Sequence, residues 1–178
     1  MPLPIGHAAI GFTTYSFSGG REFGCNRWKV LLAVLILSNL PDIDVLLGIV
    51  FVGNENVFHR GPTHSLIFAF IGGSLAYGLC RLCSRLPKLS FRICFLLVLS
   101  HIFADALFTS SPISFFWPIT VHWSAGHSGL GDVINLVLFG NYQDWKIIVG
   151  CISLVLLREP LIALGILSGL QKPRRFSG

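Results

Sequence analysis

Seven acidic and histidine side chains and one arginine stand out because they lie in or beside stretches that are otherwise apolar. They are His7, Asp42, Asp44, His59, Arg60, His64, His101 and Asp105. Imidazole nitrogens and carboxylate oxygens, with no thiolate among them, favour zinc and leave manganese and iron possible. Three carboxylates held together away from water would repel one another or take up protons unless a cation neutralised them. These residue types therefore predict a site for one or two divalent metal ions.

The stretches that carry these residues predict a helical membrane protein. Hydrophobic residues make up 53% of the 178-residue chain and charged residues only 12%, whereas soluble domains carry about 25% charged residues. Five hydrophobic segments are expected, at about 3–17, 28–52 with a break at Pro41, 63–83, 91–108 and 145 onward. Thr63 is expected to cap the third. The fold class is thus all-α and polytopic, with residues 1–178 as a single domain.

Counting along these helices places the polar residues at a similar depth in the membrane. Thirteen residues separate Lys29 from Asp42, and thirteen separate Arg92 from Asp105, which is about 20 Å in each helix. His7 comes out at about 21 Å and His64 at about 26 Å from the basic residues of their own segments. His101 and Asp105 are four residues apart and share one helix face. Four histidines and three aspartates in one layer suit a two-metal site better than a single tetrahedral one.

Each of these residues could also have an ordinary structural role. A single histidine near a membrane interface commonly bonds a neighbouring helix, and Asp42 and Asp44 could cap the helix that restarts after Pro41. A transporter for divalent metal or protons also places such residues in a membrane, although here they gather toward one face. A metal-stabilised scaffold without catalytic activity is a further alternative. Cys80 and Cys83 are expected to pack between helices.

The basic residues predict the orientation of the chain in the membrane. Ten of the 13 Lys and Arg residues fall at 21–29, 81–92 and 172–175, and such clusters mark the cytoplasmic side. The N-terminus and the loops 53–63 and 109–144 are then outside, and so is the site. Arg158-Glu159-Pro160 interrupts the last apolar stretch. Either that helix ends near Leu157 and the remainder lies along the membrane surface, or Arg158 and Glu159 neutralise each other inside the bundle. No aromatic–basic motif of the RNA-binding kind occurs, which argues against a nucleic-acid partner.

Four motifs in order carry a family resemblance. They are Gly6-His-Ala-Ala-Ile-Gly11, Leu40-Pro-Asp-Ile-Asp44, His59-Arg-Gly-Pro-Thr-His-Ser-Leu66 and Leu99-Ser-His-Ile-Phe-Ala-Asp105, followed by Phe116-Trp-Pro118. Over residues 3–118 the chain resembles the LexA-regulated, inner-membrane-associated family of metal-dependent hydrolases of prokaryotes. More distantly, it looks like the all-helical zinc-dependent phospholipase C fold.

The resemblance implies that five residues bind metal: His7, Asp42, His64, His101 and Asp105. It implies that Asp44 and His59 are close partners of these ligands. Some family members carry a histidine directly after the Asp-x-Asp motif, where this chain has Val45. His122, His127 and Asp132 lie beyond the match and either complete the site or belong to a solvated loop.

Together these features predict hydrolysis of a phosphoester, or of a lipid-linked phosphate, at the outer face of a prokaryotic inner membrane. Asp44 or Asp105 is the candidate to orient or deprotonate the attacking water. Arg60 is suited to bind a phosphate in bidentate fashion, or else pairs with a site aspartate or a lipid headgroup. Phe115, Phe116 and Trp117 either guide an acyl or prenyl chain or anchor the protein in membrane lipids.

Overall fold

The computed structural model describes residues 4–19, 27–54, 57–108, 112–119, 121–122 and 144–163, and all its regular elements are helices. In chain order they are α1 (Pro4–Phe17), α2 (Arg27–Ser38), the 3₁₀ turn η1 (Leu40–Asp42), α3 (Ile43–Val52), the 3₁₀ turn η2 (Pro62–His64), α4 (Leu66–Leu82), α5 (Phe91–Phe108) and α7 (Asp144–Ala163). The expected all-α class is confirmed, and each of the five expected hydrophobic segments contains a helix.

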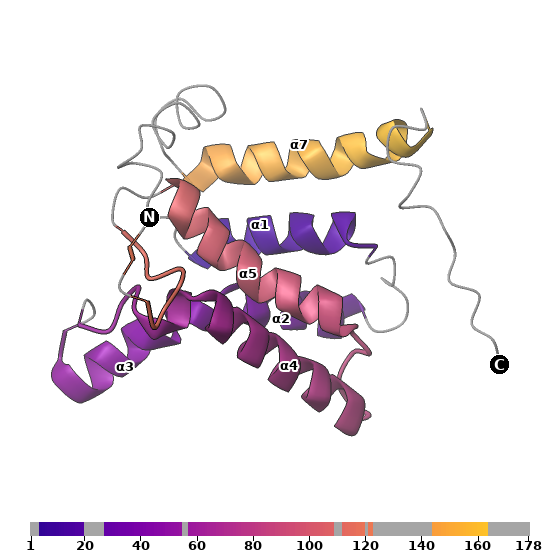
Figure 1. The fold of residues 1–178 in the computed structure, drawn as a ribbon. Coiled ribbons are helices and arrows are strands. Elements are labelled where there is room, and N and C mark those ends of the chain that lie inside the picture. The colour runs from indigo at the N-terminus through magenta and orange to yellow at the C-terminus, as the bar shows by residue number, and fades with distance from the viewer. Residues whose placement is uncertain are drawn as a thin grey trace.

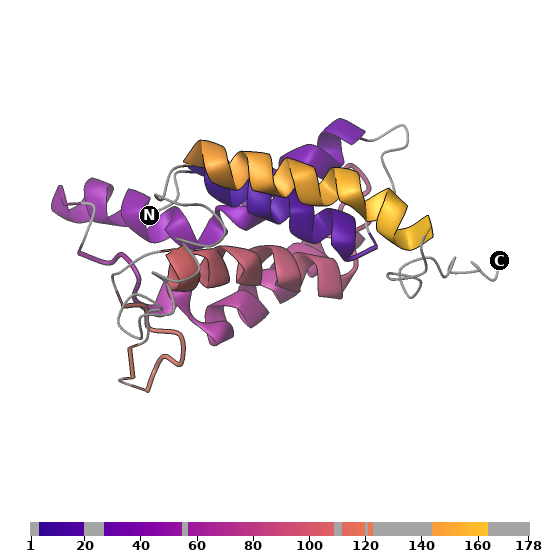
Figure 2. The same ribbon diagram turned by 90° about the horizontal axis from the view of Figure 1, so that it is seen from above.

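The long helices lie side by side in one bundle, with α5 in contact with α1, α2 and α4 (Figure 1). α7 packs along α1 on the outer side of the bundle, as both views show (Figure 2). Glycines allow the close approach of α1 to α2 and of α4 to α5. A Cβ on Gly11 of α1 would lie 2.4 Å from the Cβ of Ser38, and one on Gly73 of α4 would lie 2.8 Å from the Cα of Phe95. The bundle depends on small residues where the helices approach most closely.

The second hydrophobic segment is broken at the place that the sequence indicates. α2 and the η1–α3 portion meet at an angle of 56°, and Pro41 lies in the 3₁₀ turn between them. A proline cannot donate the backbone hydrogen bond that would continue α2. α3 therefore leaves the bundle (Figure 1), and the turn η1, which ends at Asp42, contacts α5 and η2.

Much apolar surface faces outward. On α3, Leu46, Val50 and Phe51 are 62–74% exposed, which a water-soluble surface rarely tolerates over consecutive turns. Among the described residues, α5 alone is long and apolar enough to cross a membrane, and the bent pair α2–α3 passes the same test if it is counted as one span. α4 and the Ile147–Arg158 part of α7 are apolar but shorter. The number of spans therefore stays a prediction.

Two details differ from the sequence-based expectations or resolve them. Ser65, not Thr63, caps α4, since its hydroxyl accepts the N–H of Phe68 at 3.1 Å. The expectation for Thr63 was wrong because residues 62–64 form a separate 3₁₀ turn. α7 continues past Leu157 to Ala163 as one helix, and the side chain of Arg158 is buried.

The direction of the helices separates the polar residues from the basic ones. α1 and α4 begin, and α2 and α5 end, at the end of the bundle where α3 projects (Figure 1). His7, Asp42, His64 and Asp105 lie at this end, whereas Arg27, Arg81 and Arg92 lie at the opposite ends of α2, α4 and α5. The predicted orientation across the membrane is compatible with this separation and is not tested by it.

Candidate metal centre

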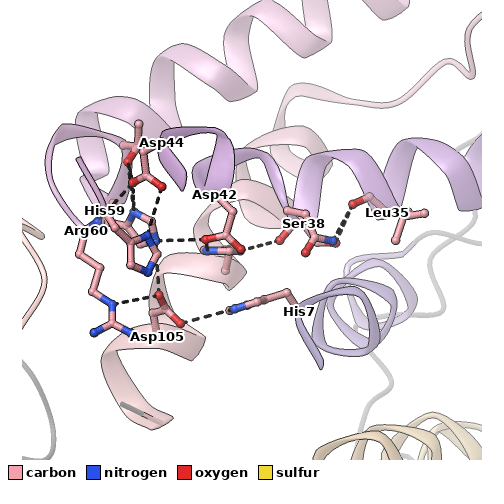
Figure 3. Close-up of polar contacts among 12 residues, drawn as sticks. His7, Leu35, Ser38, Asp42, Asp44, His59, Arg60 and Asp105 are labelled. Carbon is pink, nitrogen blue, oxygen red and sulfur yellow. Dashed lines mark hydrogen bonds and ion pairs between the residues drawn. The ribbon is translucent and has the colours of Figure 1, made fainter. Parts of the chain in front are cut away.

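All eight residues singled out in the sequence come together at one end of the bundle (Figure 3). His7 comes from the first turns of α1, and His101 and Asp105 from the last turns of α5. Asp42 and Asp44 follow the break at Pro41, and His59, Arg60 and His64 come from the segment that leads into α4. Four separate parts of the chain therefore build one buried polar cluster.

His101 is oriented by the main chain of α2. Its Nδ1 lies 2.8 Å from the carbonyl oxygen of Ser38, and a carbonyl can only accept, so Nδ1 carries the hydrogen. Nε2 then presents its lone pair to the cluster, where it lies 3.3 Å from Oδ1 of Asp42. A histidine whose second nitrogen is fixed in this way is typical of metal ligands.

Asp44 holds the surrounding loop. Its Oδ2 accepts the N–H of Arg60 at 3.2 Å and the hydroxyl of Thr63, and it lies 3.2 Å from Nδ1 of His64. Its Oδ1 lies 3.2 Å from Nδ1 of His59. The side chain of Asp44 is only 2% exposed, so these groups replace the water that a charged carboxylate needs. Asp44 therefore fixes both histidines, with the Nε2 of each left for other partners.

The remaining donor atoms face one another across a small space. Nε2 of His7 lies 3.4 Å from Oδ1 of Asp105, and Nε2 of His64 lies 3.3 Å from Oδ2 of Asp105. The Nε2 atoms of His7, His64 and His101 are buried and make no hydrogen bond with any other described residue. Buried polar atoms of this kind require an explanation, and coordination to an ion is one.

The separations fit a metal ion better than they fit hydrogen bonds. Ligands on one tetrahedral zinc lie about 3.3 Å apart, because each is about 2.0–2.1 Å from the ion. The Nε2 atoms of His7, His64 and His101 each lie 3.3–3.4 Å from a carboxylate oxygen of Asp105 or Asp42, which matches that edge length. A bond from an imidazole N–H to a carboxylate is normally about 2.7–2.9 Å. The donor set therefore fits a divalent cation.

The cluster contains three overlapping groups of suitable ligands. They are His7, His101 and Asp105; Asp42, His64 and His101; and Asp44, His59 and His64. In each group the ligand atoms lie within 4.8 Å of one another. The first two groups share His101, so they describe either one ion or two neighbouring ions. The third group shares only His64, whose Nδ1 faces Asp44.

His64 contacts two carboxylates at once, since its Nδ1 lies 3.2 Å from Oδ2 of Asp44 and its Nε2 lies 3.3 Å from Oδ2 of Asp105. A metal ligand must be deprotonated at the atom that binds the metal, so proton and metal are expected to compete at Nε2 of His64.

Arg60 lies at the edge of the cluster in an unusual backbone conformation. Its φ is 64°, in the left-handed region that residues other than glycine seldom adopt. Its N–H binds Asp44, its carbonyl accepts the N–H of Ser114 at 3.2 Å, and its Nε lies 3.7 Å from Oδ2 of Asp105. The expectation that Arg60 pairs with a site aspartate agrees with this contact, and its terminal guanidinium nitrogens are not committed by it.

Sequence reasoning missed the supporting residues. Ser38 contributes a backbone carbonyl, which carries no sequence signal, and Thr63 was expected to cap a helix, not to bind Asp44.

The loop residues considered beyond the family match are only partly described. His122 is described, and its Nδ1 lies 3.2 Å from the Ser114 hydroxyl. His127 and Asp132 lie outside the described residues. Phe115 packs on Phe103, whereas Phe116 and Trp117 are half exposed.

The buried polar cluster, the helical bundle and the outward apolar surface together define a helical membrane protein with a candidate metal centre. The chain matches the family described as YdjM inner membrane protein over residues 1–170. It belongs to that family, and a location in the inner membrane follows from this membership.

One curated relative agrees with this assignment. The chain is 43% identical over 72 residues to inner membrane protein YbcI of Escherichia coli (strain K12). The aligned part covers 40% of this chain and 40% of the relative's length. No solved structure matches the chain. These descriptions give a location and no activity, so LexA regulation and hydrolase activity remain predictions of the family resemblance.

Proposed function

We propose that the protein is a metal-dependent hydrolase that cleaves a phosphoester, or a lipid-linked phosphate, at the outer face of the inner membrane. The observation that carries the proposal is the convergence of three imidazole Nε2 atoms on the carboxylates of Asp42 and Asp105, with an arginine directly beside them. A structural metal site needs no neighbouring cation, whereas phosphoryl transfer is helped by one.

The residues divide into ligands and residues that orient them. His7, His64, His101, Asp42 and Asp105 would hold one or two divalent ions, zinc first and manganese or iron as alternatives. Such an ion supplies Lewis-acid chemistry, which activates water and polarises a phosphoryl oxygen. Asp44 already accepts hydrogen bonds from the loop around it, so we assign it to positioning His59 and His64.

Asp105 is then the better candidate to orient or deprotonate the attacking water. Its Oδ1 faces His7 and its Oδ2 faces His64 and Arg60, so it contacts two other proposed ligands as well as the arginine. Arg60 cannot lose its charge, and its planar fork matches two phosphate oxygens. We assign it to holding the phosphate group while negative charge shifts in the transition state.

Purified protein, analysed for bound metal and then screened on phosphoesters and phospholipids, tests the proposal. We expect one to two equivalents of zinc, manganese or iron per chain and turnover on at least one phosphoester. Arg60→Lys keeps the charge but loses the fork, so kcat/KM should fall about 10–100-fold, equivalent to about 1.4–2.8 kcal/mol. Its metal content should stay normal, because arginine is not a ligand.

The scaffold alternative gives the opposite results. A metal-stabilised scaffold would hold its ion, show no turnover across the panel and be insensitive to Arg60→Lys. Asp105→Asn contrasts with Arg60→Lys, since in the hydrolase it should reduce metal content and activity together. Metal-replete wild type that is inert on every ester and phosphoester would end the hydrolase proposal.

A further inference from the structure

A second feature lies next to the metal ligands but is not part of them. The segment 57–62, together with Pro112, Ser114 and His122, lines an open pocket of about 410 Å³, which is within the usual size range of ligand pockets, about 300–1,000 Å³. We call it the loop pocket. Its polar lining residues are His59, Arg60, Ser114 and His122, and Phe58 and Pro112 are among its apolar ones.

The charges of the loop pocket are opposite to those of the metal cluster. Arg60 contributes a permanent positive charge, and the two histidines add nitrogen donors or acceptors. No aspartate or glutamate is among the described residues that line it. The carboxylates lie behind it, where Asp44 contacts His59 and Asp105 contacts Arg60. The pocket is therefore suited to an anion, and the cluster to a cation.

His59 connects the two. Its Nδ1 lies against Asp44, and its side chain is only 8% exposed. Its Nε2 is buried and has no hydrogen bond with another described residue, although the ring lines the loop pocket. A buried polar atom without a partner beside a cavity indicates a ligand that completes its hydrogen bonding.

Backbone bonds hold the two sides of the loop pocket together and so keep it in shape. The N–H of Ser114 donates to the carbonyl of Arg60 at 3.2 Å, and the N–H of Leu66 donates to the carbonyl of Phe115 at 3.1 Å. The Ser114 hydroxyl lies 3.2 Å from Nδ1 of His122, which leaves the Nε2 of His122 for a ligand. A pocket formed before its ligand arrives loses less entropy on binding.

We propose that the loop pocket binds the phosphate group of the substrate, with Arg60 and His122 as its side-chain contacts and Ser114 as the residue that positions His122. The role in turnover rests on the proposed hydrolase function, but the binding site itself does not. A phosphate with a single ester substituent has three non-ester oxygens, enough for the arginine fork and the histidine together.

Isothermal titration calorimetry of the full-length, metal-loaded protein in detergent with inorganic phosphate tests the proposal. His122→Gln and Arg60→Gln should each weaken phosphate binding at least tenfold, and Ser114→Ala should weaken it less, since only the positioning contact is lost. Arg92→Gln removes an exposed arginine at the far end of α5 and should leave the affinity unchanged. The metal content of His122→Gln and Ser114→Ala should equal that of wild type.

The source of the phosphate is distinguished by a second titration with phosphatidic acid in mixed micelles. Tighter binding than inorganic phosphate, lost in His122→Gln, identifies a lipid headgroup, whereas equal binding of both that is lost in the variant identifies a free phosphate monoester. Unchanged phosphate affinity in His122→Gln and Ser114→Ala would overturn the proposal, even if the wild type hydrolyses phosphoesters. Conversely, if the protein hydrolysed no substrate but its phosphate binding still required His122, the phosphate-binding proposal would stand and the hydrolase proposal would fall.

Discussion

Gly11 connects helix packing to the candidate metal centre, and replacing it by alanine should damage both. A Cβ at this position would lie 2.4 Å from the Cβ of Ser38 and 2.9 Å from its hydroxyl oxygen. Ordinary contact begins at 3.4 Å, so α1 and α2 must separate by about 1 Å. Ser38 cannot turn away, because its Cβ is attached directly to the backbone of α2.

The separation acts directly on His101. The carbonyl of Ser38 lies 2.8 Å from its Nδ1, and a shift of about 1 Å would break that bond. Overpacking costs about 1–3 kcal/mol, and the lost hydrogen bond about 1 kcal/mol more. His7 lies one turn before Gly11 on α1, so it would also move. Metal affinity should fall about 10–100-fold, as it does when the group that orients a ligand is removed.

Gly78→Ala is the matched control. Gly78 lies in α4, and a Cβ there would meet no atom within 4 Å. Alanine is the better helix former by about 0.8–1.0 kcal/mol, so this variant should be as stable as wild type or more so, with normal metal content. Denaturation of both variants in detergent and metal analysis of the folded protein provide the measurements. If Gly11→Ala resembled Gly78→Ala in both, the close approach of α1 and α2 would not support the centre.

Three further predictions concern the loop and the membrane. Asp44→Asn keeps the shape of the side chain but removes its charge, so zinc-competition titration should show about 10–100-fold weaker binding, and unchanged affinity would contradict its positioning role. Arg60→Gly should relieve a left-handed backbone conformation that costs about 1–2 kcal/mol in residues other than glycine. Calorimetry should show that the variant loses phosphate binding but not stability, whereas retained binding would exclude Arg60 as a phosphate contact. Asn54→Cys should react with an impermeant thiol reagent from outside the cell, and Ser84→Cys only after permeabilisation; the reverse pattern would invert the predicted orientation.

The positions of the helices were largely predictable from the sequence. Residues 91–108 are mostly apolar and contain no proline or glycine, and α5 occupies that range. Pro41 marks a break that any helix must make there. The gathering of His7, Asp42, His64, His101 and Asp105 was also predictable, because their distances from the basic ends of the helices agree. These features are local or follow from the regular rise of a helix.

The division of work within the cluster was not predictable. Asp42 and Asp44 are two residues apart and chemically identical in the sequence, yet Asp44 faces the 59–64 segment and Asp42 faces His101. The difference arises from the bend at Pro41 and from loop contacts across 15 or more residues. Thr63 shows the same limit: its sequence suits a helix cap, but a nearby carboxylate competes successfully for its hydroxyl. Tertiary contacts of this kind leave no local pattern.

Arg60 lies between the candidate metal centre and the loop pocket. A residue at a φ of 64° directs its backbone N–H, its carbonyl and its side chain differently from a residue in an ordinary loop. In Arg60 the N–H donates to Asp44, the carbonyl accepts the N–H of Ser114, and Nε faces Asp105. Glycine would adopt this backbone without strain, so the arginine is explained only by what its side chain contributes. That side chain places one fixed positive charge next to Asp105 and beside the loop pocket, which is the arrangement that the proposed phosphate transfer beside a metal needs.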